Sequence, residues 1–257
     1  MMRSVVICAL GIWLGANGWA QVSNTDVAQE VAASVLDPSR RLEAEYLLLK
    51  AKDAAYFGEY NSALKLAKRC IRIDRNIVDA HLLAGNLLLR EGKATQALRY
   101  YDRVLKLGGE SVSVFQRMGS AYMSLSKHSM AETYFTRAIL INSSVANSYV
   151  LRGEARMEMG RLDLAITDFN KAVELNRRLA TGWLGLGRVV MDQGNFRLAL
   201  EHLSKAVELA PNDPQTWFYR GMANQRSFKM VAACADFRKA VELGYQKAKA
   251  YLGSTCQ

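Results

Sequence analysis

GRLDLAITDFNKAVELN, residues 160–176, is the stretch of sequence that decides the fold. Its glycine marks a turn, and the residues that follow have the periodicity of an amphipathic helix. Small residues stand at Ala165 and Ala172, with Ile166, Phe169 and Val173 as their large apolar neighbours. The same pattern returns every 34 residues along most of the chain. A period of that length predicts an array of structural repeats.

Three positions carry the repeat. A small residue lies in the first half of each unit, an alanine always follows twelve residues later, and a bulky residue usually stands shortly after that alanine. Two antiparallel helices approach closely where a small residue faces a large one, so the pattern predicts packed helix pairs. The three series are Ala51, Gly85, Gly119, Gly153, Gly187 and Gly221; Ala63, Ala97, Ala131, Ala165, Ala199 and Ala233; and Ala67, Tyr101, Phe135, Phe169, Leu203 and Phe237.

The fifth unit carries Trp183, Leu186, Gly187, Gly194, Ala199, Ala206 and Pro211, and with them the chain resembles the tetratricopeptide repeat family, in its exported bacterial form. The resemblance covers residues 44–247. It implies an all-α, right-handed superhelical solenoid of six helix-turn-helix repeats. The repeats are 44–77, 78–111, 112–145, 146–179, 180–213 and 214–247.

Two departures from the repeat pattern lead to structural expectations. Ser126 and Phe228 replace the turn glycine found at Gly58, Gly92, Gly160 and Gly194, so those two turns are expected to be less regular in shape. Arg152 and Arg220 occupy a packing position that the family fills with leucine. Their aliphatic stems are expected to lie on the core while the charged heads reach the surface.

Residues 1–20 have the features of a secretory signal peptide: Arg3, an apolar run over 4–14, and small residues before Gln21. An extracytoplasmic location, periplasmic or secreted, is therefore expected after cleavage. The alternative is an uncleaved anchor, which would be the chain's only membrane contact. Residues 21–43 form an N-terminal helical segment, in which Asp37-Pro38 predicts the start of a helix.

Residues 245–257 are expected to form a C-terminal capping helix, over Tyr245 to Leu252, and a tail. Cys234 occupies a repeat position that faces the following helix, here the cap, and Cys256 comes directly after the cap. A disulfide between them and a pair of free thiols both remain open at this point. Cys70 takes the place of the small core residues of other repeats.

In the family, the concave groove is lined by the second, fifth, ninth, twelfth and thirteenth positions of each repeat. These positions imply an apolar stripe with a central methionine ladder, which would bind an apolar or amphipathic peptide. Burial of the same residues between neighbouring first helices is the alternative. The candidate groove residues are Leu48, Lys52, Leu82, Asn86, Leu89, Gln116, Met123, Val150, Glu154, Met157, Leu184, Arg188, Met191, Phe218 and Met222.

The sequence favours a non-catalytic scaffold in an extracytoplasmic complex, with a peptide or protein as the partner. No metal or cofactor site and no specific small-molecule site is predicted, because the three histidines fall at unrelated repeat positions. The formal charge of +10 is scattered and accompanies no nucleic-acid motif, so no nucleic acid is expected as a partner. Two alternatives remain: a component of an envelope enzyme system, and a binder of an anionic envelope polymer through Lys65, Lys68, Arg69 and Arg72.

Overall fold

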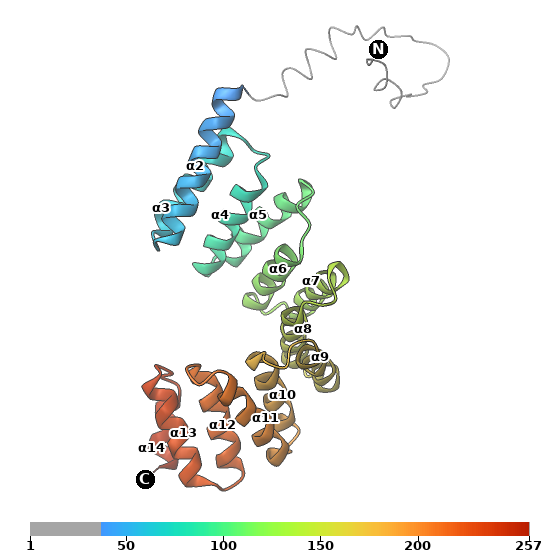
Figure 1. Cartoon of the computed structure of the whole chain (residues 1–257), viewed down its shortest axis with the longest axis vertical. Coiled ribbons are helices and arrows are strands. Elements are labelled where there is room, and N and C mark those ends of the chain that lie inside the picture. Colours follow the sequence, from blue (N-terminus) through green and yellow to red (C-terminus); the bar gives the residue numbers. More distant parts are fainter. Residues whose placement is uncertain (1–36, 257) are drawn as a thin grey trace, which may run out of the picture.

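The computed structural model describes residues 37–256, which form thirteen helices joined by short turns and contain no strand (Figure 1). The signal peptide expected over 1–20, and residues 21–36 of the N-terminal segment, lie outside the described residues. The helices are α2 Pro38–Tyr56, α3 Tyr60–Ile73, α4 Val78–Arg90, α5 Ala94–Lys106, α6 Val112–Ser124, α7 His128–Ile141, α8 Ala146–Glu158, α9 Leu162–Leu175, α10 Ala180–Asp192, α11 Phe196–Leu209, α12 Pro214–Arg226, α13 Met230–Glu242 and α14 Ala248–Thr255.

The helices pair in chain order and the pairs stack into an elongated array, with α2 at one end and α14 at the other (Figure 1). Each even-numbered helix from α2 to α12 packs against the odd-numbered helix that follows it, and those from α2 to α10 also contact the next even-numbered helix. The all-α solenoid of helix-turn-helix repeats is thereby confirmed. None of the described helices combines the length and the apolar character that a membrane span requires.

The contact between small and large residues inside each pair is confirmed. A Cβ added to Gly119 would lie 2.4 Å from Cε1 of Phe135, and one added to Gly187 would lie 2.4 Å from Cγ of Leu203. Both large side chains are completely buried. The glycines are therefore needed because the paired helices approach too closely for any side chain.

The expectation of irregular turns at Ser126 and Phe228 was wrong. Both residues adopt positive φ values, 55° and 58°, close to the 71° of Gly160. The amide of Ser126 donates to the carbonyl of Met123 at 2.9 Å, just as Gly160 donates to Met157 at 2.9 Å. The packing of the flanking helices imposes one turn geometry, even on residues that disfavour it.

Arg152 and Arg220 do not send their heads to the surface, so that expectation was also wrong. Arg152 donates to both carboxylate oxygens of Asp168, most closely from Nε to Oδ2 at 3.0 Å and from Nη2 to Oδ1 at 2.7 Å. Arg220 binds Asp236 in the same way, at 3.0 and 2.6 Å. Both carboxylates are buried, so each guanidinium stays inside the repeat to neutralise one of them.

The C-terminal helix α14 packs on α13, although it begins later than predicted, at Ala248. Gly244 ends α13 with a φ of 95°, and the chain needs the next three residues to turn back. Cys234 of α13 and Cys256 after α14 form a disulfide, with their Cα atoms 5.6 Å apart. The disulfide ties the capping helix to the last repeat. Cys70 is a buried free thiol, and burial raises its pKa to about 11.

Candidate functional site

The candidate groove residues all lie on the first helices of the repeats, α2, α4, α6, α8, α10 and α12. Their exposure differs from the expected open apolar stripe. Val150, Met157, Leu184 and Phe218 are buried. Met157 packs in a cluster with Phe169 and other core residues, so the expected methionine ladder is interrupted at its middle rung. Close stacking of successive first helices covers these side chains.

Most of the remaining apolar groove residues are partly buried. Leu82 and Leu89 pack against the core of the first three repeats, and Leu48 packs against the cluster around Ala44 and Leu47. Met123 packs against a cluster that contains Phe135. These residues therefore contribute to stacking and expose less apolar area than the expected open stripe would.

Several polar groove residues connect one first helix to the next. Lys52 of α2 donates to Asp79 of α4 at 2.7 Å, and Gln116 of α6 donates to Ser148 of α8 at 2.8 Å. Asn86 accepts a hydrogen bond of 2.9 Å from the hydroxyl of Tyr101. These three side chains are therefore engaged within the array rather than directed at a ligand.

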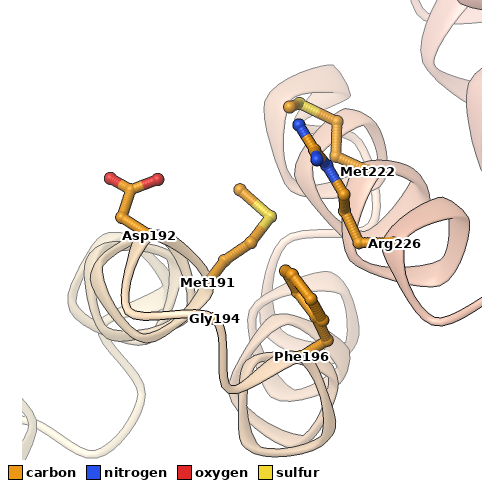
Figure 2. Close-up of a pocket in the computed structure, with 6 residues that line it drawn as sticks. All are labelled: Met191, Asp192, Gly194, Phe196, Met222 and Arg226. Atoms are coloured by element: carbon orange, nitrogen blue, oxygen red, sulfur yellow. The ribbon is translucent and has the colours of Figure 1, made fainter.

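A pocket of about 280 Å³ lies on the concave face near the C-terminal end, between α10, α12 and the turn before α11. Figure 2 shows the Met191 side chain pointing across this space towards Met222 and Arg226, with the ring of Phe196 beside it. Asp192 and Gly194 complete the lining. An apolar centre with charges of both signs at its margin suits an apolar side chain presented by a polar backbone.

Two of the pocket residues, Met191 and Met222, were among the predicted groove residues. Asp192 and Arg226 were not, although both stand at the thirteenth repeat position, which the family resemblance already implied as a lining position. Phe196 begins α11, and no groove position of the first helix would have indicated it. The pocket was not predicted because its shape depends on how the turn between α10 and α11 packs against α12 of the next repeat.

Carboxylates collect on the concave face beside the pocket. Burial raises the pKa of Glu154, while the nearby charge of Arg188 lowers it and that of Glu158 raises it. The pKa of Asp192 is raised in the same way, first by burial, against a lowering by Arg188. The guanidinium of Arg188 lies 4.8 Å from the centroid of the Tyr219 ring. The positive charge of Arg188 thus favours the ionised form of two partly desolvated carboxyl groups, those of Glu154 and Asp192.

A buried ionic network crosses the fourth repeat. Asp168, which is 1% exposed, accepts hydrogen bonds from both Arg152 and Arg156. Arg156 also donates to Glu132 of the preceding repeat at 2.8 Å, and Glu132 accepts from Arg161 at 2.8 Å. The network joins α7, α8 and α9, and it stabilises the array rather than forming an open site.

The other functional candidates do not converge. Lys65, Lys68, Arg69 and Arg72 are exposed on α3, where Arg69 forms an ion pair with Glu43 at 3.2 Å. Within residues 37–256 no group of three or more histidine, cysteine, aspartate or glutamate side chains is arranged to hold a metal ion.

Family models of the tetratricopeptide repeat match residues 48–111, 112–144, 146–178 and 180–223, which together span more than half of the chain. The matches end within α12, so the last helix pair is recognised from its geometry: Gly221 faces the ring of Phe237 as the corresponding glycines do in earlier repeats. A comparison with curated protein sequences gave no match.

Solved structures share the fold at low sequence identity. YrrB, described as a TPR protein with an unusual peptide-binding site, is 21% identical with a TM-score of 0.57, over 74% of this chain and 94% of YrrB. PilF of Pseudomonas aeruginosa is 14% identical with a TM-score of 0.66, over 83% of this chain and 99% of PilF. The APC/C hetero-tetramer Cut9–Hcn1 gives 15% identity and a TM-score of 0.73, over 91% of this chain and 46% of its counterpart.

Proposed function

Because the chain belongs to the tetratricopeptide repeat family, we propose that it is a non-catalytic scaffold that captures a peptide or partner protein on its concave face. The observation that carries the proposal is the pocket between α10 and α12. Its apolar lining, Met191, Met222 and Phe196, comes from two successive repeats, so the pocket exists only in the stacked array.

The size of the pocket favours a side chain as its occupant. At about 280 Å³ it lies at or just below the lower end of the range typical of small-molecule sites, roughly 300–1,000 Å³. Interfaces concentrate their binding energy in a few anchors that fill such pockets. Methionine is flexible, so Met191 and Met222 would adapt to anchors of different shape. We infer an apolar anchor residue, flanked by groups that hydrogen-bond to Asp192 and Arg226.

The fold likeness to YrrB supports a peptide as the ligand, since that protein is described as having a peptide-binding site. Because the likeness is one of fold, it supports peptide binding in a groove. It does not indicate the amino-acid sequence of the peptide. No nucleic acid and no specific small molecule is part of the proposal.

We also propose that the scaffold works outside the cytoplasm, after removal of residues 1–20. The Cys234–Cys256 disulfide supports this location, because disulfides persist mainly in oxidising compartments. N-terminal sequencing of the protein recovered from the cell envelope tests it. A mature form that begins at Gln21 is expected, and a cytosolic protein that retains Met1 would contradict it.

Partner capture by matched variants tests the binding function. The double variant Met191→Glu, Met222→Glu places charge in the pocket and is expected to abolish stoichiometric capture from envelope extracts. The control, Met130→Glu with Met230→Glu, changes exposed methionines at the starts of α7 and α13 and should bind normally. Equal capture by both variants would refute the pocket, and turnover of an envelope substrate by the isolated protein would refute the non-catalytic scaffold.

A further inference from the structure

The first described helix, α2, is apolar on two opposite sides. Its inner side buries Ala44, Leu47 and Ala51 against α3 and α4. Its outer side, together with the C-cap residue Phe57, carries five large apolar residues that are between 55% and 86% exposed, which we call the α2 stripe: Leu42, Tyr46, Leu49, Tyr56 and Phe57. A helix that is apolar all round is normally buried, and an exposed stripe of this kind marks an interaction surface.

The position of the α2 stripe fits stacking. Figure 1 shows α2 at the end of the array, and its main contacts among the described helices are with α3 and α4. Repeat arrays bury their apolar faces by adding a neighbour to each one, and within residues 37–256 the terminal face of the first repeat is without such a neighbour. A partner on the α2 stripe would therefore leave the concave pocket at the other end of the array open.

The charges on α2 indicate which partner suits the stripe. The chain as a whole carries +10, but α2 balances Arg40, Arg41, Lys50 and Lys52 against Glu43, Glu45 and Asp53. Several of these charges are already engaged, as in the Arg41–Glu45 pair at 3.2 Å. The surface is thus nearly neutral. It lacks the excess of basic residues that an anionic membrane would require, and two copies of it can meet without strong repulsion.

We propose that the α2 stripe is a homodimer interface, in which α2 packs antiparallel to α2 of a second copy across a twofold axis. Antiparallel packing of one helix on its own copy places Leu42 near Phe57 of the second copy and Leu49 near the centre of the contact. In this register Tyr46 faces Asp53 and Tyr56 faces Glu43 of the second copy. In both pairs a tyrosine hydroxyl can donate to a carboxylate. Every contact is repeated across the axis, which is the self-complementarity that a twofold contact needs.

The extent of the α2 stripe sets the strength of the dimer. Three partly exposed aromatic side chains, at roughly 150–250 Å² each when fully buried, and two leucines provide on the order of 500 Å² per copy. The two copies together would bury about 1,000 Å², which lies below the range of about 1,200–2,000 Å² for stable interfaces and is typical of weak, transient ones. The dimer is therefore expected to be concentration-dependent, with a Kd on the order of micromolar.

Sedimentation velocity of the purified chain, over a concentration series that brackets this Kd, tests the proposal. The wild type is expected to shift from monomer to dimer. Leu49→Glu should weaken the dimer by about 30-fold, as expected for a residue at the centre of an interface. The control Leu140→Glu changes an equally apolar residue on α7 that is 80% exposed and lies outside the stripe, so it should dimerise like the wild type.

Three results would overturn the proposal. The wild type could remain monomeric at every concentration. That result is also expected if a different protein binds the stripe. The dimer could persist unchanged in Leu49→Glu. Finally, a dimer that forms only after removal of the residues N-terminal to α2 would mean that those residues cover the stripe within one chain. Circular dichroism of both variants confirms that the fold is retained in each case.

Discussion

At the scale of single residues, the turn positions show that stacking outweighs local conformational preference. Ser126 and Phe228 hold φ values of 55° and 58°, in the left-handed region that glycine occupies at the equivalent turns. A residue with a Cβ pays roughly 1–2 kcal/mol there. The helices on either side of the turn must supply that free energy through their packing. The strain is therefore stored at two known positions of the array.

Replacing Phe228 with glycine is expected to stabilise the protein. The substitution removes the left-handed strain and loses little packing, because the Phe228 side chain is 87% exposed. We expect the free energy of unfolding to rise by roughly 1 kcal/mol, net of the added flexibility of the unfolded chain. Urea denaturation measures it. The reverse change at an equivalent turn, Gly160→Ala, should lower stability by a similar amount, and an unchanged or lower stability of Phe228→Gly would contradict the account.

Glu154 makes a second prediction at this scale, through pH. Its folded-state pKa is raised above the ordinary value of 4.5, mainly by burial, so the folded protein holds that proton more tightly than the unfolded chain. The resulting stability is present below pH 4.5 and is lost as the pH rises through the raised pKa. Glu154→Gln should therefore raise the thermal midpoint at neutral pH and change it little at pH 4. Equal effects at both pH values would rule out this assignment.

At the scale of helices and repeats, the sequence predicted the helix pairs but the buried Arg–Asp ion pairs were not expected. The small and bulky series predicted the helix pairs of the second to sixth repeats, which share one packing arrangement, whereas the first repeat has Ala67 at the bulky position. The Arg–Asp pairs were missed even though the sequence carries a signal. Arg152 and Asp168 stand sixteen residues apart, as do Arg220 and Asp236, whereas the equivalent positions in the third repeat hold Met118 and Tyr134. Comparing both positions across the repeats would have shown that arginine and aspartate occur together, and would have indicated a buried ion pair.

The exposure of the groove could not be predicted in the same way. Repeat position fixes which side of the first helix a residue occupies, but burial depends on how closely the next first helix approaches. Val150 and Phe218 are buried while Met191 and Met222 line a pocket, although all four share one side of the array. The difference in burial depends on contacts between neighbouring repeats, so the sequence of a single repeat does not predict it.

Removing the Asp168 carboxylate should be strongly destabilising. In Asp168→Ala, two guanidinium groups, those of Arg152 and Arg156, lose a buried partner. Breaking a buried pair from one side costs about 3–5 kcal/mol. The control Glu201→Gln breaks an exposed pair with Arg197 and should cost about 1 kcal/mol or less. Chemical denaturation compares the two, and similar losses for both would show that the network contributes no more than a surface ion pair.

The disulfide makes a prediction about one helix. Cys234 and Cys256 are 22 residues apart in sequence, so opening the bridge in Cys256→Ser should lower stability by about 3 kcal/mol. The loss should fall first on α14, whose amides would exchange faster than those of α10 and α11. Wild type treated with a reductant should reproduce the variant. Unchanged protection of α14 would show that packing alone holds the cap.

At the scale of the whole molecule, the array provides one continuous framework with separate surfaces. On the concave face, stacking covers several of the predicted groove residues, and side chains from two repeats form the pocket between α10 and α12. The α2 stripe lies at the opposite end of the array (Figure 1). A dimer through that end would present two pockets to the same assembly. Two linked pockets would increase the avidity for a partner that carries more than one anchor.

The most direct test of the central claim, that a partner's apolar anchor enters the concave pocket, is methionine-methyl NMR of the protein with and without its captured partner peptide. The account predicts that the Met191 and Met222 methyl resonances shift on binding. It also predicts that those of Met130 and Met230, exposed on second helices, stay in place. Shifts confined to Met130 and Met230, with Met191 and Met222 unchanged, would place the partner on another surface and contradict the account.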